Sequence, residues 1–149
     1  MSSERLWSPA FINYGVSSGI FYMTQYVLVA ALPIILTAEL GGTALDAGLA
    51  MTYFQIGTIL CRPFAGRLID GLDKRIILLI SSVLFFIIMG LFNLTTSLQT
   101  IFVLRGIHGA IFALGTTVMA ALAVVVLPAS RKGEGINMFA VFSNIAMVL

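Results

Sequence analysis

Residues 66–75 read Gly-Arg-Leu-Ile-Asp-Gly-Leu-Asp-Lys-Arg and form a short charged stretch between two long apolar runs. Charge is otherwise scarce, because charged residues make up 9% of the 149 residues, against about 25% in a typical soluble domain. Hydrophobic residues make up 60%, and the mean hydropathy is +1.08. A chain with so little polar surface is predicted to lie in a lipid bilayer, and residues 66–75 then mark a place where it leaves the hydrocarbon.

Four apolar stretches are long enough to cross a bilayer as helices, since about 20 residues span a hydrocarbon core of roughly 30 Å. They are Phe11–Leu36, Ala47–Ala65, Ile76–Leu94 and Ile101–Leu127. A fifth, residues 136–149, carries no charge but is short for a complete span. The first stretch is too long for the apolar part of a signal peptide. The sequence therefore predicts an all-α, polytopic membrane helical bundle with four complete transmembrane helices and a truncated fifth.

The basic residues of the connections alternate between the two sides of this bundle. Arg5 lies in the N-terminal tail, and five more Lys or Arg residues lie in the connections after the second and fourth spans. The two other connections, Thr37–Asp46 and Thr95–Thr100, contain no Lys or Arg. Because Lys and Arg concentrate in cytoplasmic loops, we expect the N-terminus and the loops Gly66–Arg75 and Pro128–Gly135 to be cytoplasmic.

Local signals agree with the predicted helix ends. Thr43-x-x-Asp46 and Thr96-x-x-Gln99 have the spacing of capping boxes at the starts of the second and fourth helices. Arg62 and Pro63 lie one turn before Gly66. We expect Arg62 to extend to the inner membrane surface and Pro63 to kink the end of the second helix, so both are predicted to be structural.

The charged stretch resembles a loop of the major facilitator superfamily, Gly-x-x-x-Asp-(Arg/Lys)-x-Gly-(Arg/Lys)-(Arg/Lys), which joins its second and third helices. The matching positions are Gly66, Asp70, Lys74 and Arg75, with Asp70 expected near the start of the third helix. The resemblance implies a conformational gate that holds the two halves of a transporter in one state. The alternative is a solvated loop whose basic residues only set the orientation.

Three further segments resemble the same family. Val29–Pro33 is similar to the Ala-Leu-Pro ending of a helix in its proton-coupled exporters, Leu104–Gly109 to its Arg-x-x-(Gln)-Gly motif, and Pro128–Gly133 to a short basic turn. The resemblance covers the first five of the twelve helices of such proteins, which have two six-helix halves. It implies the N-terminal portion of a bacterial transporter in the cell membrane, whose partners are the lipid bilayer, a small-molecule substrate, protons and a C-terminal half. It implies no cofactor.

Arg105 and His108 form the first candidate constellation inside the membrane. A cation at this depth costs about 2.5 kcal/mol or more, so it usually faces the bundle interior or a wet cavity. At positions i and i+3 the two side chains share one helix face. We predict that they take part in proton coupling or hold an anionic group of the substrate. The alternative is that Arg105 reaches the outer interface and His108 bonds to a neighbouring helix.

Polar residues of the first helix form the second constellation. Gln25 and Tyr26 lie near the middle of the first span, and Asn13 near its start. An uncharged polar group at membrane depth needs a partner or a cavity. The family resemblance implies that these residues line the central cavity. The alternative is a hydrogen bond between helices, worth roughly 0.6 kcal/mol.

Other classes of function lack support in the sequence. There is no His-Glu metal pair, no pair of membrane carboxylates, and no serine or cysteine beside a plausible base, so neither an enzyme nor a metal site is predicted. No glycine-rich phosphate loop follows a strand. The basic residues do not gather on one face, which argues against nucleic-acid binding. The remaining readings are proton-coupled efflux as part of a transporter, and a small non-transporting membrane protein that oligomerises or binds a partner; the unfinished fifth span favours the first.

Overall fold

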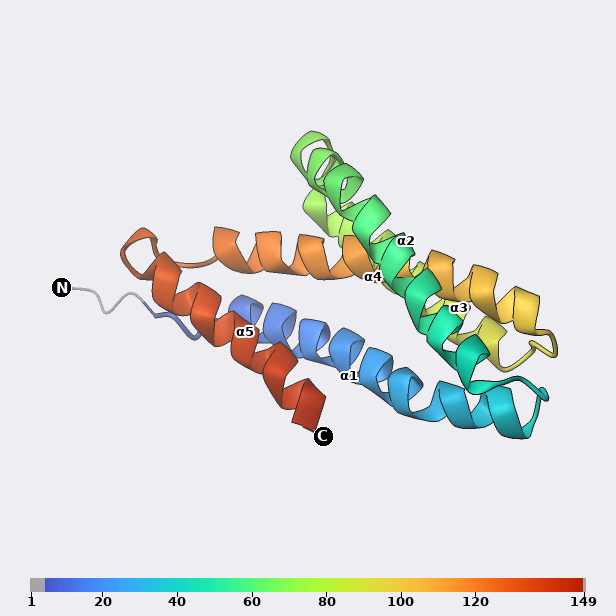
Figure 1. Cartoon of the computed structure of the whole chain (residues 1–149). Coiled ribbons are helices and arrows are strands. Elements are labelled where there is room, and N and C mark those ends of the chain that lie inside the picture. The colour runs from blue at the N-terminus through green and yellow to red at the C-terminus, as the bar shows by residue number, and fades with distance from the viewer. Residues whose placement is uncertain (1–4, 149) are drawn as a thin grey trace.

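The computed structural model describes residues 5–148, and within this range all regular secondary structure is helical (Figure 1). The elements are α1 (Pro9–Ala38), α2 (Ala44–Gly71), α3 (Lys74–Phe92), α4 (Leu98–Val125), the short 3-10 helix η1 (Ala129–Arg131) and α5 (Lys132–Val148). Helices α1 to α4 are long and apolar enough to cross a membrane. The predicted all-α bundle is confirmed, and α5 has 17 residues.

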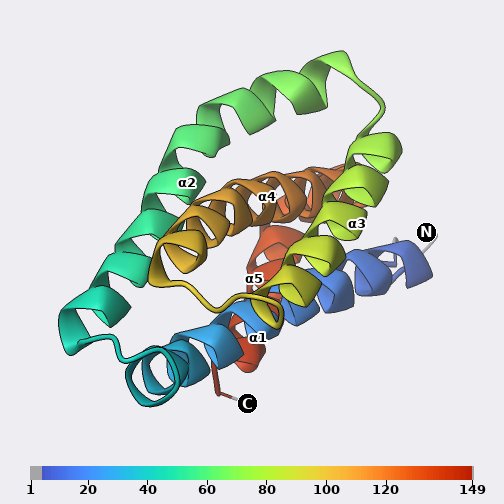
Figure 2. The same ribbon diagram turned by 90° about the vertical axis from the view of Figure 1, so that its right-hand side faces the viewer.

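Helix α4 is the centre of the bundle and packs against each of the other four long helices. More than half of its most apolar window, 56%, is buried, compared with 22% for the corresponding windows of α1, α2 and α3. Figures 1 and 2 show α1 and α5 side by side next to α4, and Figure 2 shows α4 between α2 and α3. A side chain placed on α4 can therefore contact several helices at once.

Glycines bring the backbones of α2 and α4 into contact. A Cβ atom on Gly109 would overlap the carbonyl oxygen of Phe54, and one on Gly57 would overlap that of Gly106. The Thr58 hydroxyl donates a hydrogen bond of 3.1 Å across this contact to the Gly109 carbonyl. Small residues allow such approaches between membrane helices, which gain van der Waals packing that bulkier residues would prevent.

One of the two predicted capping boxes forms. The Asp46 amide donates to the Thr43 hydroxyl at 3.3 Å, and the Thr43 amide donates to the Asp46 carboxylate at 2.7 Å, which confirms the box at the start of α2. The prediction for Thr96 and Gln99 was wrong. The N-cap of α4 is Ser97, one residue later, and Gln99 is then too close in sequence to close a box, so its side chain accepts from the Ser97 hydroxyl at 3.0 Å.

The charged stretch is mostly helical. Helix α2 contains Pro63 and continues to Gly71, so that only Leu72 and Asp73 connect it to α3. Figure 2 shows that the second half of α2 curves toward α3. Asp70 consequently lies in the last turn of α2, and its expected position near the start of the third helix was wrong. Asp73 takes that position as the N-cap of α3, where its carboxylate accepts from the Arg75 amide at 2.7 Å.

The turn before α5 is held by the one ion pair found among residues 5–148. The Arg131 guanidinium contacts both carboxylate oxygens of Glu134, at 2.7 and 2.8 Å. These hydrogen bonds hold the pKa of the Glu134 carboxyl below its usual range. A negative charge in the first turn also suits the dipole of α5.

Candidate functional site

Three polar side chains meet in the apolar interior of the bundle, and we call them the arginine cluster: Arg105 and His108 of α4 and Gln25 of α1. Arg105 and His108 are fully buried, and Gln25 is nearly so. One guanidinium nitrogen of Arg105, Nη1, lies 3.2 Å from Gln25 Oε1 and 3.3 Å from His108 Nδ1. The residues predicted to share a helix face therefore lie together, and they join α4 to α1.

The other contacts of Arg105 are with α2. Its Nε donates to the carbonyl oxygen of Ala50 at 3.4 Å, and its Nη2 lies 3.2 Å from the sulfur of Met51. The guanidinium carbon lies 4.6 Å from the centre of the Phe54 ring, a cation–π distance. Among residues 5–148 no carboxylate pairs with Arg105. Neutral acceptors and an aromatic ring thus surround this cation. The alternative in which Arg105 reaches the outer interface is contradicted, because the side chain is fully buried.

His108 lies in an aromatic cage with one nitrogen engaged. The centres of the neighbouring rings are 5.1 to 6.4 Å from the imidazole centre, and they belong to Phe54, Phe85, Phe92 and Phe112. Since a guanidinium can only donate, Nδ1 is the acceptor of the Arg105 hydrogen bond. The other nitrogen, Nε2, is buried and has no hydrogen-bond partner in the described part of the chain. A buried polar atom without a partner is costly and points to function.

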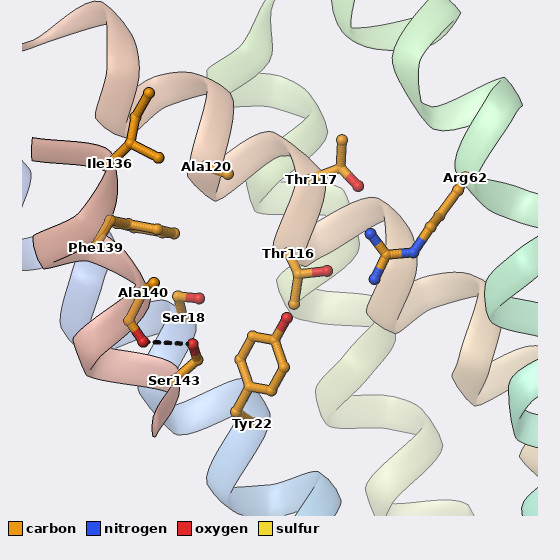
Figure 3. Close-up of a pocket in the computed structure, with 10 residues that line it drawn as sticks. All are labelled: Ser18, Tyr22, Arg62, Thr116, Thr117, Ala120, Ile136, Phe139, Ala140 and Ser143. Carbon is orange, nitrogen blue, oxygen red and sulfur yellow. Dashed lines mark hydrogen bonds between the residues drawn. The ribbon is translucent and has the colours of Figure 1, made fainter. Parts of the chain in front are cut away.

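Two cavities lie between the helices, and the second of them borders the arginine cluster. The first, of about 330 Å³, opens between α1, α2, α4 and α5 (Figure 3). Its lining is Ser18, Tyr22, Arg62, Thr116, Thr117, Ala120, Ile136, Phe139, Ala140 and Ser143. The second, of about 290 Å³, is lined by Tyr22, Gln25, Tyr26, Val29, Phe54, Gln55, Thr58, Arg62 and Phe112. Gln25 belongs to both the second cavity and the arginine cluster, so the buried arginine is one hydrogen bond from the cavity wall.

The structure brings together only part of the predicted cavity lining. Gln25 and Tyr26 line the second cavity. Asn13 is exposed, lines neither cavity, and accepts a hydrogen bond from Ser17 one turn further along α1. With 3.6 residues per turn, Asn13 lies on a different face of α1 from Gln25. Sequence polarity alone could not separate these residues, because it ignores rotation around the helix.

The predicted gate residues lie far from the cluster. Gly66 and Asp70 are in the last turns of α2, and Lys74 and Arg75 begin α3. The α2 residues that contact Arg105 lie in the first half of that helix. Lys74 donates from Nζ to the carbonyl oxygen of Ile69 at 3.1 Å, which satisfies a free carbonyl at the end of α2. Among residues 5–148, Asp70 forms no ion pair with Lys74 or Arg75.

Sequence reasoning missed the position of Arg62. The side chain was expected to reach the inner membrane surface, but it lines both cavities instead (Figure 3). Side chains on a helix tilt toward its N-terminus, which for Arg62 leads back toward the middle of α2. This geometric rule could have predicted the direction of the Arg62 side chain from the sequence.

Comparison with known proteins agrees with the helical architecture. The family model described as Major Facilitator Superfamily matches residues 14–149. Proteins named "Uncharacterized MFS-type transporter" in Pseudomonas aeruginosa strains LESB58, UCBPP-PA14 and PAO1 are each 42% identical over 54 residues. The matched segment is 36% of this chain and only 13% of each relative's length. Because the family model covers nearly all of this chain, the chain belongs to the major facilitator superfamily of multi-pass membrane transporters.

Proposed function

We propose that this chain forms the N-terminal helices of a bacterial secondary transporter that exports small molecules in exchange for protons. Transporters of this family rock two six-helix halves around a site at the bilayer midplane. The observation that carries the proposal is the arginine cluster. It places a buried cation and a titratable histidine against three helices at the wall of a cavity.

The cluster offers a simple route from protonation to movement. His108 Nδ1 accepts from Arg105 Nη1 in the structure described here, and the imidazole is therefore unprotonated at that nitrogen. In an imidazolium both nitrogens are donors, so a doubly protonated His108 would direct an N–H group at the N–H groups of Arg105. The contact would break, and Arg105 would move relative to Gln25 and the carbonyl oxygen of Ala50. Proton binding would thereby alter the contacts that join α4 to α1 and α2.

The gate residues are part of the proposal. Asp70 is exposed at the end of α2 and has no ion-pair partner within residues 5–148, so its carboxylate is available to a second half of the transporter. Lys74 fixes the beginning of α3 to the end of α2 through the Ile69 carbonyl, which keeps Asp70 and Arg75 at one tip of the bundle. We propose that these groups hold the two halves of the transporter together in one state of the transport cycle, and that a helix of the second half packs closely against Gly66.

We propose that the α2–α3 connection and the N-terminus are cytoplasmic. Single cysteines at the exposed residues Leu45 and Leu72, in a Cys61→Ser background, test this orientation. A membrane-impermeant maleimide is expected to label Leu45→Cys in intact cells and Leu72→Cys only after permeabilisation. Labelling of Leu72→Cys in intact cells, with Leu45→Cys protected, would reverse the orientation.

Transport into everted membrane vesicles tests the function. We would express the full-length protein and follow three probes of similar size: naphthalenesulfonate, an anion; naphthalenesulfonamide, which is neutral; and naphthyltrimethylammonium, a cation. An exporter that exchanges substrate for protons is expected to concentrate at least one probe when the vesicle interior is acidic. The accumulation should disappear when nigericin removes the pH gradient. Accumulation of none of the probes above that in vesicles lacking the protein would favour the small non-transporting membrane protein instead.

A further inference from the structure

Arg62 is the charged side chain that the two cavities share. In Figure 3 its guanidinium extends from α2 toward Thr116 of α4 and Tyr22 of α1. Tyr22 lines both cavities as well, so the two hollows meet at these two side chains. Arg62 lies nine residues before the end of α2 at Gly71, which is about 14 Å along the helix axis. The cation is therefore well inside the length of the helix and faces the cavities.

No negative charge balances Arg62. Among residues 5–148 it has no ion pair, and none of the side chains that line the two cavities is acidic. A cation at membrane depth is costly unless it faces a wet cavity or a partner. Arg62 also has no hydrogen-bond partner among these residues, so all five of its N–H donors are available to a ligand.

The hydroxyl groups that line the first cavity together with Arg62 divide into two sets. The hydroxyls of Thr116, Thr117 and Ser143 donate to carbonyl oxygens of their own helices, at 2.8, 2.6 and 2.8 Å. Their protons are therefore used within the protein. The hydroxyls of Tyr22 and Ser18 have no hydrogen-bond partner among residues 5–148 and can donate into the first cavity. The free donors of this cavity are thus a guanidinium, a phenol and an alcohol, which together suit an anionic group.

The rest of the first cavity is apolar. Ala120, Ile136, Phe139 and Ala140 form this part of its wall. Volumes of about 330 and 290 Å³ are at the lower end of the range of small-molecule sites. An apolar body can therefore pack against α4 and α5 while an acidic group faces α2.

We propose that Arg62 determines the substrate class of the transporter and selects organic anions, in which a carboxylate, sulfonate or phosphate is attached to a small apolar body. Guanidinium groups bind the oxygens of such anions in bidentate geometry. This proposal rests on the proposed transport function, because only a transporter has a transported substrate. The binding of the anion can nevertheless be tested without a transport assay.

Equilibrium dialysis of the purified full-length protein in detergent, with the same three naphthalene probes, tests the selection. The wild type is expected to bind naphthalenesulfonate more tightly than the neutral or cationic probe. Arg62→Gln should weaken sulfonate binding by roughly tenfold or more, the effect of losing a charge-assisted hydrogen bond. Arg62→Lys keeps the charge but loses the bidentate geometry, so its affinity for naphthalenesulfonate should lie between those of the wild type and Arg62→Gln. Arg62→Glu should reverse the preference and bind naphthyltrimethylammonium more tightly than the wild type does.

A matched control comes from the same helix. Arg67 is exposed on α2 and lines neither cavity, so Arg67→Gln removes the same charge and should leave the affinity for naphthalenesulfonate unchanged. Equal affinity of the wild type for the three probes, binding of none of them, or equal losses in Arg62→Gln and Arg67→Gln would overturn the proposal. Selective, Arg62-dependent binding without proton-driven accumulation in vesicles would instead overturn the proposed transport function and leave this assignment standing.

Discussion

Arg105→Leu is expected to reduce proton-driven accumulation in everted vesicles to the level of vesicles without the protein, while the helices remain folded. Arg105 is fully buried and contacts α1 through Gln25 and α2 through Ala50 and Met51. It has no carboxylate partner in the described residues, so the substitution leaves no buried anion behind. A buried charge carries a desolvation penalty, and even complete buried ion pairs can often be replaced by well-packed apolar residues with no loss of stability. Transport is therefore expected to be lost without a matching loss of thermal stability.

A structural role for Arg105 makes the opposite prediction. If the arginine only joins the helices, Arg105→Leu lowers the melting temperature in detergent, and any remaining folded protein transports normally. His108→Gln is the companion variant, because the amide keeps a hydrogen-bond acceptor beside Arg105 and cannot take up a proton. We expect folded protein that lets the probe equilibrate across the membrane but no longer concentrates it when the vesicle interior is acidic. Unchanged proton dependence in His108→Gln would remove the histidine from the coupling step.

Gly109→Ala is expected to destabilise the protein by about 3 kcal/mol, because the added methyl group cannot fit between α4 and α2. Its Cβ would overlap the carbonyl oxygen of Phe54 and lie 3.0 Å from the Thr58 amide nitrogen, and both neighbours are backbone atoms that cannot turn aside. The two helices would have to separate, which also disturbs the hydrogen bond from Thr58. Unfolding of the full-length protein by titration with SDS, followed by circular dichroism, measures the loss.

Gly48→Ala is the matched control for this substitution. Gly48 also lies within a helix, α2, but no atom lies within 4 Å of a Cβ built on it. Alanine there should stabilise the helix by roughly 0.5–1 kcal/mol, because glycine loses more backbone entropy on folding. Equal stability changes in Gly48→Ala and Gly109→Ala would show that the backbones of α2 and α4 are not in contact at Gly109.

The helices could be predicted from the sequence because hydrophobic length is a local property. The spans, the capping box at Thr43 and the shared face of Arg105 and His108 all follow from spacings of a few residues. The start of α4 was placed one residue early, because Thr96 and Ser97 are both suitable N-caps and the choice between them depends on the loop. The family resemblance, carried by short motifs, is confirmed by the family model over residues 14–149.

The site could be predicted only in part, because its contacts join distant segments. Gln25 precedes Arg105 by 80 residues, and no local pattern shows that these two side chains form a hydrogen bond. The sequence also does not show which face of α1 points into the bundle, so Asn13 was grouped with Gln25. The distance of Arg62 from the end of the helix allows a contact with the membrane surface, but this distance carries no information on the direction in which the side chain extends.

Reverse coupling in proteoliposomes tests the central claim, proton exchange by the full-length protein, most directly. Coupling between two ligands is reciprocal, so a substrate gradient should drive protons when no pH gradient is present. We would enclose the pH indicator pyranine with whichever probe the vesicles accumulate, and dilute the proteoliposomes into probe-free buffer of the same pH. Proton exchange predicts that the interior acidifies as the probe leaves, and that Arg105→Leu abolishes this change. Exit of the probe from wild-type proteoliposomes at constant internal pH would contradict the account.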